Sequence, residues 1–312
     1  MESKMKFLSI GEPLAEFNNP LDAPDQFNRN AGGDTLNTAI YLSRLTPAGS
    51  VGYLSRLGDD KMSAFLRGVI VDEGITDLCA TEIGGRPGLS FITTDANGER
   101  SFTYWRDQAP ARKLFQSPED LAVLEQADVL FLSGITLAVL YPEGRANLLA
   151  ALAQRKAAGA QVVLDTNYRP RLWPNAETAA AVIGQAAGIA TLVLPSLDDM
   201  EACFGQPEAE GAMALLQGLT DAEIVLTTGG DDVLYRAAGS ADVRAIPLPP
   251  RRPARDTTGA GDSFNAGWLS SRAAGLSVEA AIARAAAVAA EVVTYPGAIM
   301  PRAAMPTFEA QN

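Results

Sequence analysis

A glycine-rich segment directly before an acidic residue is the part of this sequence best suited to do chemistry. Residues 256–264 read DTTGAGDSF, so Gly259–Gly261 precede Asp262, and a long Ala-rich helical pattern follows. Glycines let backbone approach an anion closely, and amides at a helix N-terminus point toward negative charge. A bound phosphate would repel an aspartate here, unless the aspartate is the base for a hydroxyl that attacks the phosphate. The segment therefore predicts a kinase for a small alcohol.

Asp262 also has a simpler interpretation, as the N-cap of the helix that follows it. Capping would explain the aspartate but not the Gly-Ala-Gly before it. We therefore favour the catalytic role.

Composition excludes several other classes of function. The chain has 312 residues, enough for one large α/β domain or two smaller ones. Its net charge of -12 gives no basic surface for DNA or RNA. Histidine is absent, which removes His-based triads, His general bases and His metal sites. An acidic protein that binds anionic ligands must concentrate positive charge locally, which directs attention to the arginines.

Cysteine content and hydropathy indicate a cytoplasmic protein without a membrane partner. Cys79 and Cys203 are too few for a disulfide framework and fit a reducing compartment. The N-terminus leads straight into an expected strand, without the apolar region of a signal peptide. The apolar run 280–293 is broken by Arg284 and Glu291, so no membrane span is expected.

Short apolar runs alternate with amphipathic patterns along the chain. The expected strands are Phe7–Ile10, Val51–Ser55, Val129–Ser133, Val162–Asp165, Leu192–Leu194 and Ile224–Thr227. The expected helices are Thr35–Leu45, Lys61–Glu73, Gly144–Ala158, Ala176–Ala187, Met200–Phe204, Ser263–Ala274 and Val278–Thr294. Apolar strands alternating with helices are typical of a mostly parallel sheet covered on both faces.

Two segments depart from that alternation. Residues 12–30 and 88–106 are polar, turn-rich and β-like, with strand formers such as Phe91, Phe102 and Trp105. No internal repeat or low-complexity linker divides the chain. We expect one domain, residues 1–312, that carries these segments as a small lid.

Two glycine-rich signatures lie far apart, GGDTLN at 32–37 and DTTGAGD at 256–262. In this order and at this separation they resemble the PfkB/ribokinase-like carbohydrate kinases. The resemblance covers the chain from about Ile10 to Pro306 and implies a three-layer α/β/α sandwich with a β lid. Further segments are similar to the branch of the family that acts on 2-keto-3-deoxygluconate. They are residues 33–39, 87–89, 98–100, 104–106, 132–135, 167–173 and 297–302.

In this family the second signature carries out the phosphoryl transfer. The resemblance implies that Asp262 takes the proton from the sugar hydroxyl. It also implies that the backbone amides of Gly259, Ala260 and Gly261 hold the transferring phosphoryl group, reinforced by the helix dipole.

The first signature is expected to bind the sugar. Gly32 and Gly33 would let the sugar approach backbone at the start of the next helix. In the family, a polar residue at the position of Asp34 binds sugar hydroxyls, and Asn37 does the same. A turn with Asp34 as helix N-cap is the alternative, and it is compatible with ligand binding.

Arginines set the expected substrate class. A neutral hexose needs hydroxyl partners, whereas a sugar acid needs a cation, and guanidinium suits a carboxylate bidentately. Arg106 lies two residues after Tyr104, so strand alternation puts both on one face. Arg169 lies just past the strand 162–165, where α/β proteins place ligands. In the 2-keto-3-deoxygluconate branch the matching Tyr and both Arg hold the acid, although a lid arginine by itself is usually a solvated charge.

Ser90 departs from the pattern, because close relatives carry Tyr after the Pro-Gly-Leu of residues 87–89. The change removes an aromatic wall or hydroxyl from the sugar end of the site. An epimeric acid or a mixed specificity therefore stays open.

ATP is expected at three places, two glycine-rich loops and one strand end. The residues are Thr228, Gly229, Asp231, Gly259, Gly261, Asn167 and Arg169. A plain turn between strands 224–227 and 233–236 is the alternative for the first loop.

Magnesium would be held mostly by ATP phosphates and water, since it seldom uses an all-protein cage. The family's Asn-x-x-Glu motif is represented here by DDME at 198–201, which implies an indirect metal role for Glu201. Acids at a helix start are also common for dipole reasons. Many members use a monovalent cation such as K⁺ near Asp256, Thr258 and Gly297, and the sequence leaves open whether this chain does.

The resemblance thus implies an ATP-dependent kinase that phosphorylates the terminal C6 hydroxyl of 2-keto-3-deoxy-D-gluconate. A kinase for a neutral sugar, such as a fructokinase, is the nearest alternative. A non-catalytic sugar-acid sensor on the same scaffold is a further one, and the intact Gly-Ala-Gly-Asp argues against it. Lid strands in this family often pair between subunits, so a homo-oligomer is expected.

Overall fold

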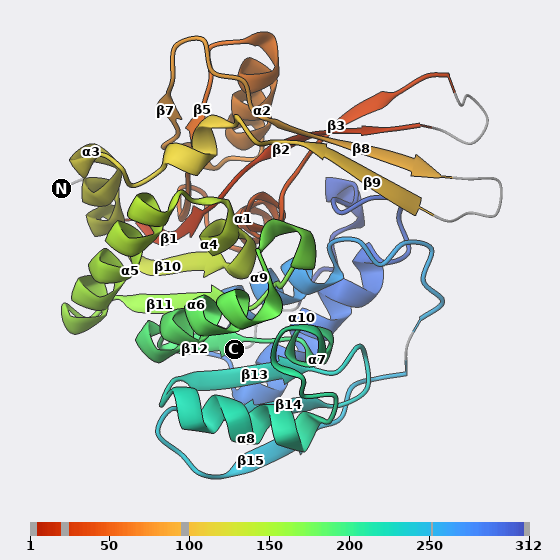
Figure 1. Cartoon of the computed structure of the whole chain (residues 1–312). Helices are drawn as coiled ribbons and strands as arrows, with labels where there is room; N and C mark the ends of the chain where they lie inside the picture. Colours follow the sequence, from red (N-terminus) through yellow and green to blue (C-terminus); the bar gives the residue numbers. More distant parts are fainter. Residues whose placement is uncertain (1–4, 20–24, 95–99, 251, 309–312) are drawn as a thin grey trace.

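The computed structural model describes residues 5–19, 25–94, 100–250 and 252–308. Its framework is a nine-stranded sheet (Figure 1). In spatial order the strands are β15 (Val243–Ile246), β14 (Val233–Arg236), β13 (Glu223–Thr227), β12 (Leu192–Leu194), β11 (Gln161–Asp165), β10 (Ala127–Ser133), β1 (Met5–Ile10), β4 (Val51–Leu54) and β6 (Thr76–Asp77). All pairs from β13 to β6 are parallel, and β14 and β15 add antiparallel strands at one edge. The predicted mostly parallel sheet is confirmed.

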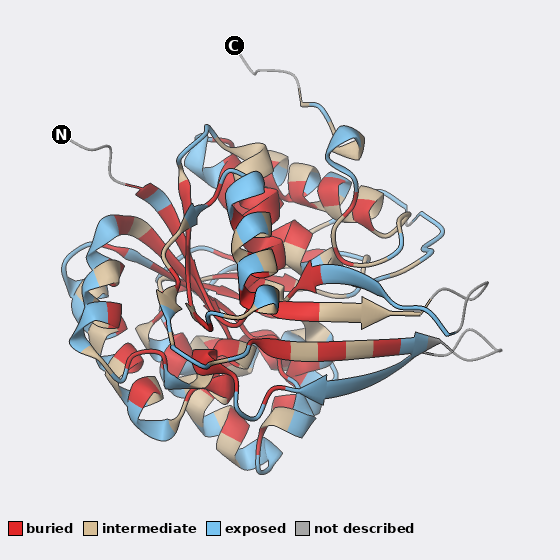
Figure 2. Cartoon of the chain, turned by 90° about the horizontal axis from the view of Figure 1, so that it is seen from above, coloured by how far each residue is buried: buried red, intermediate tan, exposed pale blue. Residues whose placement is uncertain are grey.

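Helices cover the two faces of this sheet because its strands are apolar on both sides. One core contains Phe7 and Phe131, and the other contains Leu8 and Leu130, as the alternation of side chains along a strand requires. The first core packs against α1 (Asp34–Leu45), α2 (Lys61–Asp72), α9 (Ala260–Ala273) and α10 (Val278–Val292). The second packs against α4 (Gly134–Val139), α5 (Pro142–Ala157) and α6 (Ala176–Ile189). Figure 2 shows the sheet as a mostly buried layer inside these helices.

Smaller elements complete the fold. Near β13, α7 (Leu197–Phe204) and α8 (Ala209–Leu219) share a separate apolar cluster that includes Met200 and Leu216. Further short elements are α3 (Pro118–Ala122), β5 (Arg56–Leu57), β7 (Ala80–Thr81) and the 3-10 helices η1 (Pro110–Lys113), η2 (Val123–Gln126), η3 (Pro170–Leu172) and η4 (Arg302–Ala304). Among the described residues, no helix is long and apolar enough to cross a membrane.

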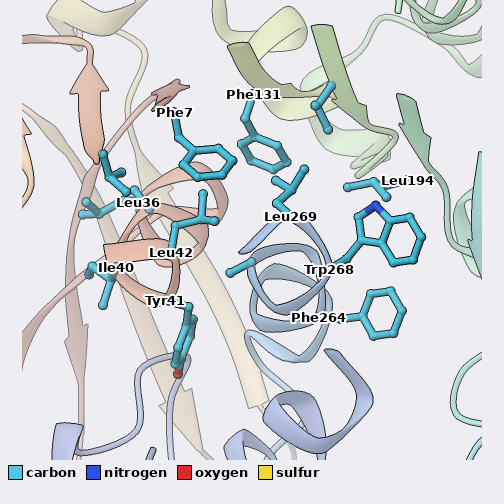
Figure 3. Packing of buried hydrophobic residues seen from close by; sticks show 14 of the residues in the cluster. Phe7, Leu36, Ile40, Tyr41, Leu42, Phe131, Leu194, Phe264, Trp268 and Leu269 are labelled. Carbon is cyan, nitrogen blue, oxygen red and sulfur yellow. The ribbon is translucent and has the colours of Figure 1, made fainter. Parts of the chain in front are cut away.

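The packing of α1 against α9 matters most for function (Figure 3). Both helices contribute large side chains that are fully buried, Tyr41 from α1 and Trp268 from α9. The Tyr41 hydroxyl donates to the carbonyl oxygen of Ala298 at 2.7 Å and accepts from the Met300 amide at 2.9 Å. These contacts hold α1, α9 and the C-terminal loop together. The N-terminal ends of α1 and α9 therefore meet at one place.

A second sheet projects from the main body (Figure 1). Its strand order is β3 (Asn28–Gly32), β2 (Leu14–Asn18), β8 (Gly88–Thr94) and β9 (Arg100–Trp105). These strands arise from the two segments that the sequence marks as β-like, 12–30 and 88–106. Residues 20–24 and 95–99 of those segments, including Gly98 and Glu99 of the 98–100 motif, lie outside the described residues.

We predict opposite effects for the same glycine-to-alanine change in two helices. A Cβ at Gly267 in α9 would lie 2.6 Å from the Ala285 Cα in α10, whereas a Cβ at Gly68 in α2 meets nothing within 4 Å. Gly267→Ala should lower the free energy of unfolding by about 1–3 kcal/mol because the helices must separate. Gly68→Ala should raise it by roughly 0.5–1 kcal/mol. Urea unfolding measures both, and an equal change in the two variants would contradict the close approach of α9 and α10.

Candidate active site

Asp262 lies where the N-terminal ends of α1 and α9 meet. It is in the first turn of α9, and the N-cap of that helix is Gly259, so the capping interpretation of Asp262 is wrong. The Asn37 side-chain amide donates to Asp262 Oδ2 at 2.8 Å, and Thr38 Oγ1 donates to the Asp262 carbonyl at 3.3 Å. The first signature therefore holds the acid of the second in place.

The surroundings of Asp262 tune its acidity. Burial and the nearby Asp34 carboxylate raise the pKa of Asp262 to about 7, against the opposing effects of the Asn37 hydrogen bond and Arg169. A carboxylate with a pKa close to the working pH is suited to take a proton from a hydroxyl.

The loop before α9 is shaped to leave backbone amides open. Gly259 has φ 80, and a Cβ there would lie 2.5 Å from the Ala298 carbonyl oxygen, so only glycine fits. The Ala260 amide donates to the Thr257 carbonyl at 3.2 Å. The amides of Gly261 and Asp262 donate to no described residue. The Gly259 amide likewise donates to no described residue, so Ala260 is the one of the three expected residues that uses its amide within the turn. The anion hole expected from Gly259, Ala260 and Gly261 stays a prediction.

Asp256 anchors the start of this loop. Its Oδ1 accepts from the Thr258 amide at 3.1 Å and from Thr258 Oγ1 at 2.7 Å, and its Oδ2 accepts from the Gly297 amide at 2.6 Å. The three residues expected near a monovalent cation are therefore bonded to one another.

The predicted sugar-binding residues lie beside Asp262. Gly33 has φ 112, and a Cβ there would lie 2.4 Å from the Glu12 carbonyl oxygen. Gly33 is also the N-cap of α1, so the N-cap role considered for Asp34 is wrong. Asp34 Oδ2 instead accepts from the Asn167 side-chain amide at 2.9 Å. Asn37, expected to bind the sugar, points its amide at Asp262, and its Oδ1 is buried without a partner among the described residues.

Two further acids, which the sequence analysis missed, lie at the carboxyl end of β11. Asp165 accepts from the Asn265 side-chain amide at 3.0 Å and from the Asn167 backbone amide at 3.2 Å. Asp199 accepts from Thr166 Oγ1 at 2.9 Å and from the Tyr168 amide at 3.0 Å.

The pKa values of both acids are raised. Burial raises the pKa of Asp165 well above its usual value, helped by the charges of Asp199, Asp262 and Asp34. Burial likewise raises the pKa of Asp199. The position of Asp165 at the end of a buried strand was the available sequence signal.

Glu201 does not join this group. It is exposed on α7, whereas Asp199, Met200 and Cys203 form the buried side of that helix. The helical period of 3.6 residues turns Glu201 away from a face that includes Asp199. Among the described residues, no group of three or more acidic or cysteine side chains is arranged to hold a metal ion.

Arg169 and Asn167 follow β11, as predicted. The Arg169 Nη1 donates to the Tyr168 carbonyl at 2.8 Å and lies 3.7 Å from Asp199 Oδ1, and its side chain is 57% exposed. Asn167 has φ 22, an uncommon conformation for a residue other than glycine, and its side-chain Oδ1 is buried without a partner among the described residues. Asn167 links Asp34 to Asp165, so it lies within the acidic group.

The second sheet presents a row of polar residues. In register across its four strands lie Asn30, Glu16, Ser90 and Tyr104. Ser90 is 1% exposed, and its Oγ has no partner among the described residues. The charge of Glu16 raises the pKa of both Tyr104 and Asp262, so Glu16 lies near both groups.

Arg106 differs from expectation. It shares a face with Tyr104, as predicted, with its guanidinium carbon 5.7 Å from the centre of that ring. It is not a free lid charge, however, because Nε and Nη2 both donate to Oε2 of the buried Glu12. Burial raises the pKa of Glu12, and the Arg106 guanidinium opposes that shift.

The first predicted nucleotide loop is a hairpin turn. Thr228, Gly229 and Asp231 lie between β13 and β14, which pair antiparallel. Thr228 Oγ1 donates to the Asp232 carbonyl at 2.6 Å across the turn. The turn that the sequence allowed is therefore present, and its contact with nucleotide stays a prediction.

Comparison with known proteins identifies the family. A model described as "pfkB family carbohydrate kinase" matches residues 6–304. The chain belongs to the pfkB family of carbohydrate kinases. It is 39% identical to the 2-dehydro-3-deoxygluconokinase of Escherichia coli K12, over 96% of this chain and 99% of that protein. Identity to the 2-dehydro-3-deoxygluconokinase of Dickeya dadantii is 40%, over 95% and 97% of the two chains.

Solved structures agree with this family assignment. The crystal structure of fructokinase with bound ATP from Xylella fastidiosa matches with a TM-score of 0.79 and 26% identity, over 97% of this chain and 96% of that one. The family and the fold predicted for this pfkB-family kinase are thus confirmed.

We predict that Asp262→Asn stabilises this kinase at alkaline pH. Because the folded-state pKa of Asp262 is about 7 and its ordinary value is 3.8, the folded protein holds this proton more tightly than the unfolded chain. Stability should therefore fall as pH rises from about 4 to about 7, and Asn removes that loss. Thermal unfolding should show a higher Tm for the variant, with a larger difference at pH 8 than at pH 5. A difference independent of pH would contradict the raised pKa.

Proposed function

We propose that this chain transfers the γ-phosphoryl group of ATP to the C6 hydroxyl of 2-dehydro-3-deoxygluconate, also called 2-keto-3-deoxygluconate. The main support is the arrangement of Asp262, which is fixed by Asn37, has a pKa of about 7 and lies beside open amides of α9. The identities of 39% and 40% to two 2-dehydro-3-deoxygluconokinases favour this acid over a neutral sugar.

In the proposed reaction, Asp262 accepts the proton of the C6 hydroxyl as its oxygen attacks the γ-phosphorus. The bond between that phosphorus and the bridging oxygen of ADP breaks, giving ADP and the 6-phosphate. The amides of Gly259, Gly261 and Asp262, at the positive end of the α9 dipole, stabilise the negative charge on the transferring group. Asn37 keeps the Asp262 carboxylate oriented toward the hydroxyl.

The cations needed for two anionic substrates come from several sources. Arg169, with its exposed guanidinium, and Arg106 on the second sheet are the proposed partners of the sugar carboxylate. Mg²⁺ would enter with ATP, bound mainly by phosphates and water, because the described residues form no metal cage. When bound, Mg²⁺ would neutralise part of the negative charge on the phosphates. A monovalent cation and a nucleotide role for Thr228, Gly229 and Asp231 remain parts of the proposal.

The second sheet is the proposed lid of a single-domain enzyme. It carries Ser90 and Tyr104 on the face toward Asp262, where a closed lid would exclude water as a competing acceptor. Exposed aromatic residues on its strands, including Trp105 at 63% exposed, support pairing between subunits in a homo-oligomer.

A substrate panel tests the proposed function. We expect phosphorylation of 2-keto-3-deoxygluconate with a kcat/KM at least about tenfold above that of its galacto epimer and of fructose. Arg169→Ala should raise the KM for the acid about tenfold with little change for fructose, because only the acid loses an ionic partner. Coupled detection of ADP measures the rates. Equal rates on fructose and the acid would favour the neutral-sugar alternative.

The pH dependence of turnover tests the role of Asp262. As pH falls below about 7, Asp262 becomes protonated, so kcat/KM should fall about tenfold per pH unit. Asp262→Asn should lower kcat by about 10²–10⁴-fold. If Asp262→Asn turns over substrate as fast as the unaltered protein, the assignment of Asp262 as the base is refuted. If neither protein shows measurable turnover, the sensor alternative is favoured instead.

A further inference from the structure

The buried Glu12–Arg106 ion pair links the two sheets at the edge of the site. Glu12 follows β1 of the main sheet, and Arg106 follows β9 of the second sheet. Their side chains are 1% and 8% exposed, so neither charge is solvated. Removing charges from water is costly unless they are paired, and an ion pair contributes less to stability than an apolar pair of similar size. Such a pair calls for a reason other than stability.

Glu12 occupies one particular edge of the guanidinium. Both contacts, from Nε and from Nη2, go to the same oxygen, Oε2. Nη1 donates to no described residue, so the edge formed by Nη1 and the second Nη2 hydrogen is left for another acceptor. A guanidinium has five donors in a rigid fork, and this remaining edge matches a carboxylate bidentately.

The surroundings of Glu12 fix its position in turn. A Cβ at Gly88 would lie 2.6 Å from Glu12 Oε1, so this glycine on β8 leaves room for the carboxylate. Oε1 is buried without a partner among the described residues. The Glu12 carbonyl lies against Gly33, the N-cap of α1. Glu12 therefore touches the first signature with its backbone and the second sheet with its side chain.

We propose that Glu12 is a positioning residue for substrate selection, which turns the free edge of Arg106 toward the carboxylate of the sugar acid. This inference rests on the proposed function and adds a residue that acts through Arg106 without touching substrate. Without the Glu12 charge Arg106 is still a cation, but its guanidinium is no longer held in one orientation. Selection of the acid over a neutral analogue should then weaken, whereas the ATP site should not change.

The test compares 2-keto-3-deoxygluconate with 3-deoxyfructose, in which CH₂OH replaces the carboxylate and C2 to C6 are unchanged. Glu12→Gln should raise the KM for the acid about tenfold, lower the ratio of kcat/KM for acid over analogue by a similar factor, and leave the KM for ATP unchanged. In an Arg106→Met background the same change should have no effect on that ratio, because Glu12 then has nothing to orient. An unchanged or lower KM for the acid, or an effect that persists in the Arg106→Met background, would overturn the proposal.

Glu73→Gln is the matched control. Glu73 also pairs with a buried arginine, Arg44, but at the C-terminal ends of α1 and α2, away from the N-terminal end of α1 that meets Asp262. There it also contacts Arg302. It should lower Tm as Glu12→Gln does and leave the acid-to-analogue ratio unchanged. If Glu12→Gln lowers kcat/KM for the acid and for the analogue by the same factor, as a general loss of folding would, the positioning role is wrong.

Glu12→Asp covers the case in which Glu12→Gln does not fold. It keeps the charge and draws the carboxylate back by one methylene, so it should lower the ratio with a smaller loss of Tm. A normal ratio in this variant would count against the proposal. Turnover of the acid by the unaltered protein tests the proposed function separately: without it both ideas fail, and with it a normal ratio in the Glu12 variants refutes the positioning role alone.

Discussion

Repulsion between aspartates is the constraint on which the rest of the site depends. Asp34, Asp165, Asp199 and Asp262 lie close enough for their charges to raise the pKa of Asp165. Carboxylates cannot be gathered in a partly buried place unless donors satisfy them. The fold supplies those donors largely from asparagines, which carry no charge of their own: Asn37 to Asp262, Asn167 to Asp34 and Asn265 to Asp165. The packing of α1 on α9 and the end of β11 keep these pairs in register.

The same constraint explains how the second sheet joins the site. Arg106, the arginine that follows β9, is already paired within the protein, because the Glu12 carboxylate neutralises its charge. An unpaired guanidinium in this buried place would be costly, and the Glu12 carboxylate offsets that cost. Pairing it with an acid at the end of β1 keeps it on the side of the sheet that also carries Tyr104.

Much of this architecture could be predicted from local sequence. The strands of the parallel sheet have continuous apolar runs, and the loop before α9 has a glycine, Gly259, at the position where φ 80 and close contact with Ala298 require one. Contacts between distant residues could not be predicted in this way. Nothing near Arg106 in the sequence marks its pairing with Glu12, and nothing near Asn37 marks its hydrogen bond to Asp262. The burial of Asp199 could not be predicted for a related reason, because the buried side of α7 depends on what packs against it.

Crowding of the acids has a cost in stability and a benefit in chemistry, and both arise from the same contacts. A lone, solvated aspartate would be ionised at neutral pH and would hold a proton too weakly to serve well as a base. Burial next to Asp34 moves the pKa of Asp262 to about 7, where proton transfer from a hydroxyl is easier. The hydrogen bond from Asn37 limits that shift, so the carboxylate is still available at physiological pH. Removing the repulsion to gain stability would therefore also lower the pKa of Asp262, although burial, the larger cause, would still hold it above its ordinary value.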